Sequence, residues 1–221
     1  MAHNNLGLLL ANTRRTDEAM AHYNKALELN PNYAEAHNNL GLLLVNMGKP
    51  DEAMAHYNKA LEINPNYGGA HFNLGLLLAN MGQSNEAMAH YLKALELNPN
   101  HSKTHNNIGL LLASMGRPDE AMAHYRKALE INSNSAEVHF NIGLLLANMG
   151  RSDEAMAHLL KALEINPNLA QAHNIVGVLL AKTGRPDEAM SHLLKALELD
   201  PNDGDVQHNL GLLRAQMGRN D

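Results

Sequence analysis

The chain has 221 residues, 45% of them hydrophobic, so it is long and apolar enough to fold around a buried core. Its formal net charge of −6 argues against a nucleic-acid binder, which needs clustered Lys and Arg to neutralise phosphates. No run of ~18 apolar residues occurs, which excludes a membrane-spanning helix. The lack of cysteine excludes disulfides and thiolate metal sites and fits a reducing compartment. We therefore expect a folded, cytoplasmic protein that binds neither nucleic acid nor membrane.

An aliphatic residue followed by glycine recurs every 34 residues along the chain. The aliphatic residues are Leu6, Leu40, Leu74, Ile108, Ile142, Val176 and Leu210. A fixed period of this length indicates a solenoid of stacked repeats. We number the repeat so that the aliphatic residue is position 7. Gly then falls at position 8, Ala at positions 20 and 27, and usually Pro at position 32.

The first half of each repeat predicts an amphipathic helix. In the second repeat, Ala36, Leu40 and Leu43 share one face at helical spacing and form a core stripe. Gly41 belongs to a second face of small residues. Such a face lets a neighbouring helix approach closely.

A turn and a second helix follow. Gly48 suits a left-handed helix C-terminus, and Pro50 suits the first turn of the next helix. The second helix places Tyr57 and Ala60 on one apolar stripe, and it ends near Pro65.

The final repeat consists of a first helix alone. Gln207, Arg214 and Gln216 stand where earlier repeats have His, Leu and mostly Asn, a change typical of a polar terminal cap, although truncation from a longer protein is an equal alternative. One helix pair is too small to bury its own apolar faces, so stability must come from stacking on neighbouring pairs. We expect residues 1–221 to form one all-α array of six helix pairs plus a terminal helix.

The repeat resembles that of the tetratricopeptide repeat family over the whole chain. The residues that carry the resemblance are Gly41, Ala53, Ala60 and Pro65 and their equivalents. Two positions depart from the family pattern: position 4 is His rather than a large aromatic, and position 11 is Leu rather than Tyr. The resemblance implies a right-handed superhelical solenoid of 34-residue helix-turn-helix repeats. It also implies that positions 2, 5, 6, 9 and 13 of the first helices line a concave groove.

Asparagine dominates two of these groove positions. Position 6 carries Asn5, Asn39, Asn73, Asn107, Asn141 and Asn209, and position 13 carries Asn12, Asn46, Asn80 and Asn148. A carboxamide both donates and accepts hydrogen bonds, so such a row can pair with the backbone of an extended peptide whatever its side chains. The row resembles the asparagine ladder of O-linked N-acetylglucosamine transferases, with an interruption at Ile175. The alternative is that these side chains solvate the wall or pair between adjacent repeats to fix their register.

Position 9 places an aliphatic strip beside the asparagines. The strip consists of Leu8, Leu42, Leu76, Leu110, Leu144, Val178 and Leu212. If exposed, it is an apolar patch of the kind that contacts partners; the alternative is packing between repeats. Lys103 is the one basic residue at position 2, so the sequence argues against the carboxylate clamp of chaperone-binding family members.

Twelve of the 14 histidines fall in two columns. Position 4 carries His3, His37, His71, His105, His139 and His173, and position 23 carries His22, His56, His90, His124, His158 and His192. We expect both columns to be structural, with the position-23 histidines packing against the following repeat, because a metal site needs several converging ligands. His101 and His105 have i, i+4 spacing, but two ligands alone are a weak signal. We expect no metal and no cofactor.

No catalytic motif is present: there is no G-x-S-x-G, no phosphate-binding glycine loop and no Cys nucleophile. We predict a non-enzymatic scaffold that holds an extended or helical segment of a protein or peptide partner in its groove. A second hypothesis is a non-catalytic, substrate-recruiting fragment of a larger glycosyltransferase. A third is a structural array that self-associates through its open ends or its leucine strip. The fold does not specify the identity of the partner.

Overall fold

The computed structural model describes residues 1–218, which form thirteen helices and no strand. In chain order the helices are α1 (Ala2–Asn12), α2 (Thr16–Leu29), α3 (Ala34–Asn46), α4 (Pro50–Ile63), α5 (Gly68–Asn80), α6 (Ser84–Leu97), α7 (Ser102–Ser114), α8 (Pro118–Ile131), α9 (Ala136–Asn148), α10 (Ser152–Ile165), α11 (Ala170–Lys182), α12 (Pro186–Leu199) and α13 (Gly204–Met217). The expected all-α array of helix-turn-helix repeats is thus confirmed. The chain divides into two compact units, Met1–Leu111 and Leu112–Asp221.

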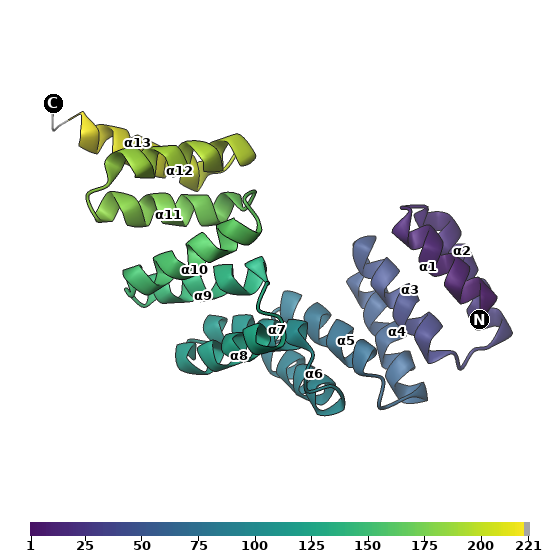
Figure 1. The fold of residues 1–221 in the computed structure, drawn as a ribbon. Coiled ribbons are helices and arrows are strands. Elements are labelled where there is room, and N and C mark those ends of the chain that lie inside the picture. The colour runs from purple at the N-terminus through teal and green to yellow at the C-terminus, as the bar shows by residue number, and fades with distance from the viewer. Residues whose placement is uncertain (219–221) are drawn as a thin grey trace. The chain divides into compact units, whose positions relative to one another are not determined.

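Within each unit, helices pack in the order of the chain (Figure 1). In the first unit α1 packs on α2, α3 on α4 and α5 on α6, and α2 also contacts α3, as α4 contacts α5. In the second unit α9 packs on α10 and α11 on α12, and α12 contacts α13. First helices of adjacent repeats touch as well, as in α1 with α3, α3 with α5, and α11 with α13. The first helices α1, α3 and α5 therefore form a continuous face in the first unit, and α11 adjoins α13 in the second.

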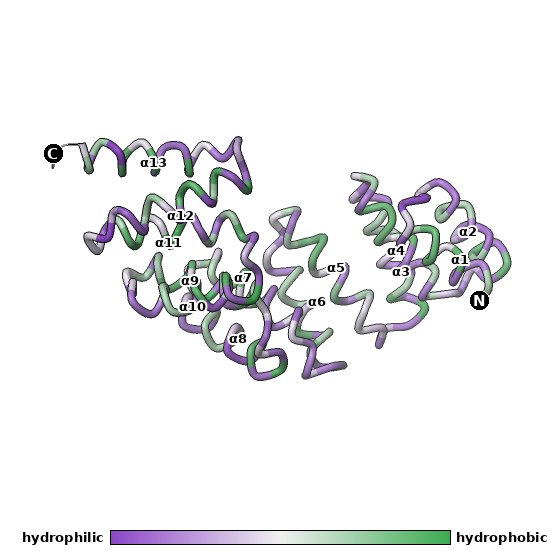
Figure 2. Tube along the Cα trace, turned by 45° about the horizontal axis from the view of Figure 1, so that its top comes forward, coloured by the Kyte–Doolittle hydropathy of each residue, from purple (hydrophilic) through white to green (hydrophobic). Residues whose placement is uncertain are grey.

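The core of each repeat is built from the predicted small and aromatic positions. Ala53 and Ala60 of α4 are fully buried on either side of Tyr57, which is 1% exposed. A Cβ added to Gly41 would lie 2.7 Å from Cε1 of Tyr57, so glycine at position 8 is what lets the tyrosine ring pack against α3. Figure 2 shows the resulting pattern, in which each helix mixes hydrophobic and hydrophilic residues along its length.

The turn glycines adopt the predicted left-handed conformation. Gly48, Gly82, Gly116, Gly150 and Gly184 have φ between 72° and 77°. The first repeat has Arg14 at this position, with φ 59°, in a region that a residue with a Cβ enters at a cost. Position 15 of the repeat is therefore a helix-ending position that normally requires glycine.

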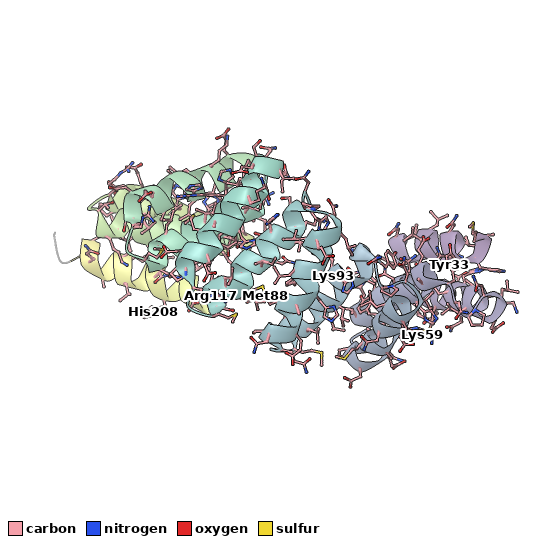
Figure 3. All side chains as sticks on the ribbon, turned by 90° about the horizontal axis from the view of Figure 1, so that it is seen from below. Tyr33, Lys59, Met88, Lys93, Arg117 and His208 are labelled. Carbon is pink, nitrogen blue, oxygen red and sulfur yellow. The ribbon has the colours of Figure 1, made fainter. Side chains whose placement is uncertain are left out.

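The outer surface of the second helices carries i, i+3 ion pairs. Examples are Lys59 with Glu62, Lys93 with Glu96 and Arg117 with Glu120, and Figure 3 labels the three cations. Because these side chains are largely exposed, each pair adds little to stability. Among residues 1–218, no helix is long and apolar enough to cross a membrane.

Candidate peptide-binding site

The strip at position 9 is exposed over much of its length. Leu42 is 44% exposed, Leu76 39% and Leu110 41%, while Leu144 and Val178 are half-buried. Packing between repeats therefore leaves these leucines accessible to solvent. An accessible row of leucines on adjacent first helices is a surface that a partner can cover.

The position-6 asparagines connect neighbouring repeats. Asn39 Nδ2 donates to Asn4 Oδ1 at 3.1 Å, and Asn73 Nδ2 donates to Asn38 Oδ1 at 2.9 Å. Asn209 Nδ2 likewise donates to Oδ1 of Asn174, position 5 of the preceding repeat, at 2.9 Å. The acceptors Asn4 and Asn38 are buried, at 0% and 6% exposure. The register role that the sequence left open is thus present in three repeats.

In two further repeats, position 5 of the preceding repeat is Phe, which has no carboxamide. Where that residue is Phe72, Asn107 hydrogen-bonds the Tyr91 phenol instead. Burial raises the pKa of Tyr91 to about 12, and the bond from Asn107 opposes that rise. Where position 5 is Phe140, its side chain cannot accept a hydrogen bond as a carboxamide does, and position 6 of the next repeat is Ile175. Sequence reasoning treated Ile175 as a break in a ligand-binding row, and the inter-repeat bonding gives it a structural reason.

The inter-repeat bond uses only part of the hydrogen-bonding capacity of an asparagine side chain. A carboxamide has two N–H donors and an oxygen with two lone pairs, and the bond from Asn39 to Asn4 uses one N–H. Asn39, Asn73 and Asn209 remain half-buried at the surface, and Asn12, Asn46, Asn80 and Asn148 are exposed. Asn141 is 6% exposed and offers a ligand little surface. Contact between these asparagines and a peptide stays a prediction.

A cleft lies where these features meet in the first unit. It has a volume of ≈ 310 Å³ and is bounded by Leu8 and Asn12 of α1 and by Asn39, Leu42 and Asn46 of α3. Arg14 and Tyr23 complete one side. All but two of these seven residues occupy groove positions predicted from the sequence.

The second unit repeats this cleft between α11 and α13. Its volume is ≈ 360 Å³, and its lining includes Val178, Lys182, Asn209, Leu212 and Gln216. These are positions 9 and 13 of one repeat and positions 6, 9 and 13 of the next, the same set as in the first unit. Both volumes fall at the lower end of small-molecule pockets, ~300–1,000 Å³, and suit side chains better than a large cofactor.

The histidine columns form pairs inside each repeat. Nδ1 of His37 lies 2.9 Å from Nδ1 of His56, and the same pair recurs at 2.8–3.1 Å in four other repeats. The two columns therefore hydrogen-bond each other within these five repeats, and packing of position 23 against the following repeat stays a prediction. The partner lies on the first helix of the same repeat, because position 23 faces back across the pair.

The second ring nitrogen of the position-4 histidine determines the tautomer of both histidines in a pair. His37 Nε2 lies 3.0 Å from the carbonyl oxygen of Pro31, so it carries the proton and donates. Its neutral Nδ1 is then an acceptor, and His56 must donate from its own Nδ1. Burial lowers the pKa of His56, and the neighbouring His37 lowers it further. This arrangement stabilises two neutral rings.

His101 and His105 do not converge. His101 Nδ1 lies 2.6 Å from Thr104 Oγ1, whereas His105 Nε2 lies 3.1 Å from the carbonyl oxygen of Pro99. Burial lowers the pKa of His101, to which nearby Lys103 and His105 also contribute. Within residues 1–218 no group of three potential ligands gathers around a point.

Comparison with family models decides the family. Models described as tetratricopeptide repeat match residues 34–67, 67–134, 112–179 and 170–203, and a TPR repeat model matches residues 15–48. The chain is a tetratricopeptide repeat protein. The tetratricopeptide matches together run from residue 15 to residue 203, and the comparison with curated proteins finds no match.

Several solved tetratricopeptide structures are similar. YrrB, described as a TPR protein with an unusual peptide-binding site, is 28% identical over 84% of this chain and 96% of its own, with a TM-score of 0.64. PilF of Pseudomonas aeruginosa is 26% identical over 94% of each chain, with a TM-score of 0.85. MamA is 27% identical over 75% of this chain and 96% of its own, with a TM-score of 0.65.

Proposed function

We propose that this tetratricopeptide repeat protein is an interaction scaffold that holds an extended or helical segment of a partner protein along its first helices. The observation that carries the proposal is the recurring cleft in which aliphatic residues of position 9, most of them exposed leucines, flank a fixed asparagine. Burying such leucines against a partner is favourable by about 25 cal/mol per Å² of apolar surface. The likeness to YrrB, which is described as binding peptide, supports the same function.

The asparagines supply direction rather than the main driving force. Each carboxamide that is already held by its neighbour loses little freedom when it bonds a peptide, so its remaining N–H is preorganised. The matched families are repeat families, and none indicates an enzyme. The likeness of the row to that of glycosyltransferases, and self-association, stay predictions.

Leucine variants test the proposal better than asparagine variants, because the asparagines also join repeats. A randomised peptide library is selected on the wild-type chain, and the affinity of the selected peptides is measured by fluorescence anisotropy. Changing Leu42→Ser together with Leu76→Ser should weaken binding by about tenfold or more. Leu92→Asn is the matched control, since Leu92 is 52% exposed on α6 and Asn occupies its position in two other repeats.

Equal affinity for the double variant and the wild type would contradict the proposal, as would loss of binding in the control alone. If the library yields no binder and light scattering shows association that rises with concentration, the leucine strip instead joins copies of the chain.

A further inference from the structure

The cations of this chain divide into paired and unpaired sets. Most of them form i, i+3 pairs with glutamates on or beside the second helices, as Lys25 does with Glu28 and Lys161 with Glu164. Within residues 1–218, Arg14 and Lys182 form no ion pair with any carboxylate. Both are exposed, so each carries a positive charge that no carboxylate in the described part of the chain neutralises by an ion pair.

These two cations stand in equivalent surroundings. Arg14 lines the cleft between α1 and α3, and Lys182 lines the cleft between α11 and α13. The positions differ, 15 in one repeat and 13 in the other, so the cations are not products of the repeat pattern. Neither cleft is lined by any Asp or Glu. Each cleft therefore combines an apolar floor, two or three carboxamides and one cation outside the ion pairs.

This composition points to the chemistry of the occupant. An apolar floor takes a hydrophobic side chain, and an unpaired cation beside it is best satisfied by a carboxylate, which makes a charge-assisted hydrogen bond. We propose that the clefts select partner segments in which a leucine-like side chain stands next to Asp or Glu. This inference rests on the proposed function and names its class of partner.

The net charge of −6 does not oppose this assignment. Exposed charges more than a Debye length apart, about 8 Å at physiological ionic strength, are largely screened. Many of the carboxylates are also paired with lysine or arginine on the second helices. Among the residues that line each cleft, the cation is therefore the only charged side chain.

Three synthetic peptides of equal length test the inference. The first has a leucine between two aspartates, the second a leucine between two lysines, and the third a serine between two aspartates. Anisotropy at low and at high salt should show that the first peptide binds most tightly and that only its affinity falls strongly with salt.

Single substitutions then locate the effect. Arg14→Gly and Lys182→Asn each remove a cation and install the residue found at that position in other repeats, so the fold should be kept. Each change should weaken the first peptide about two- to fivefold and leave the second unchanged or tighter. Arg126→Asn is the matched control, because Arg126 is an exposed cation of α8 outside both clefts and Asn again stands at its position elsewhere.

Two results would overturn the inference. One is equal binding of the aspartate and lysine peptides, and the other is an effect of Arg126→Asn as large as that of Arg14→Gly. If leucine peptides of both charges bind and lose affinity on Leu42→Ser, the scaffold function stands and only the acidic selectivity fails. If Leu42→Ser changes nothing for any peptide that binds, the proposed function itself fails.

Discussion

At the scale of single residues, the histidine pair replaces the large aromatic that the family places at position 4. His71 reaches across to His90 through Nδ1 and back to the carbonyl oxygen of Pro65 through Nε2. One imidazole thus ties together the two helices of its repeat and the loop before it. A ring with two polar nitrogens can do this only while it stays in one tautomer, which couples the link to pH.

We predict that the chain loses stability as the pH falls through the histidine range. Burial lowers the pKa of His90, His158 and His192, and the partner histidine adds to the effect. Because these folded-state pKa values lie below the unfolded value of about 6.5, the unfolded chain binds protons first. The contribution of the histidine pairs to the free energy of unfolding is therefore fully present above the unfolded pKa of about 6.5, and it is lost as the pH falls through the lower folded-state pKa values. The urea midpoint should be lower at about pH 5 than at about pH 8.

A substitution within one pair isolates this effect. Glutamine stands at position 4 in the last repeat, where Gln207 Nε2 donates to the carbonyl oxygen of Pro201 at 2.9 Å. His71→Gln should keep the corresponding bond to Pro65 and reduce the loss of stability on acidification. His208→Asn, at an exposed site where Asn is common, should leave it unchanged. A pH dependence that both variants share with the wild type would contradict the role of the pairs.

At the scale of helices, glycine at position 8 sets how closely the two helices of a repeat approach. A Cβ on Gly75 would meet the Tyr91 ring at 2.8 Å and the backbone oxygen of Ala87 at 3.3 Å. Gly211 occupies the same position in α13, which has no described second helix beside it, and a Cβ there meets nothing within 4 Å. The same residue at the same position therefore has two different roles.

We predict opposite effects of alanine at these two glycines. Gly75→Ala should destabilise the chain by about 1–3 kcal/mol through overpacking. Gly211→Ala should stabilise α13 by about 0.5–1 kcal/mol, because alanine is the better helix former. Thermal unfolding of both variants measures the difference. Equal shifts of the same sign would show that helix propensity, and not the contact with Tyr91, governs position 8.

A second link joins repeats through the asparagines. Asn73→Ala should cost about 1–3 kcal/mol, because it removes the donor to the buried oxygen of Asn38. Asn80→Ala changes an exposed carboxamide of the same helix and should cost much less. Urea unfolding of the two variants makes the comparison. Similar small losses would mean that water replaces the inter-repeat bond at no cost.

The repeat pattern predicts which face each residue occupies but not which partner it finds there. The period of 34 placed the buried Ala53, Tyr57 and Ala60 correctly, and it aligned Leu42 and Leu76 on one strip but left the exposure of that strip open. It did not predict the bond of Asn39 to Asn4, because periodicity does not say which of several neighbouring helices a side chain faces. For the same reason the pairing of His37 with His56 was missed, although both columns were visible.

At the scale of the whole molecule, the ends of the array differ from its interior. In α1, Leu6 is 40% and Leu9 61% exposed, whereas their equivalents in α3, Leu40 and Leu43, are 3% and 5% exposed. Helix α1 packs on α2 and α3 alone, while α3 packs on α1, α2, α4 and α5. In a linear array, stability is the sum of such neighbour contacts.

We therefore predict graded hydrogen exchange along the chain. Amides of α1 and α13 should exchange faster than those of α5 and α11, because terminal helices open without disrupting two interfaces. Mass spectrometry after pulses of deuterium measures this gradient. Uniform exchange in all helices would instead favour the single cooperative array expected from the sequence.

The central claim is that partners bind on the leucine strip of the first helices. Leucine methyl groups labelled for NMR, titrated with a peptide selected on the wild-type chain, test it most directly. We expect the methyl signals of Leu8, Leu42 and Leu76 to shift with the peptide, and those of Leu92, Leu160 and Leu194 on the second helices to stay unchanged. Shifts confined to that second set would place the binding surface on the opposite helices and contradict the account.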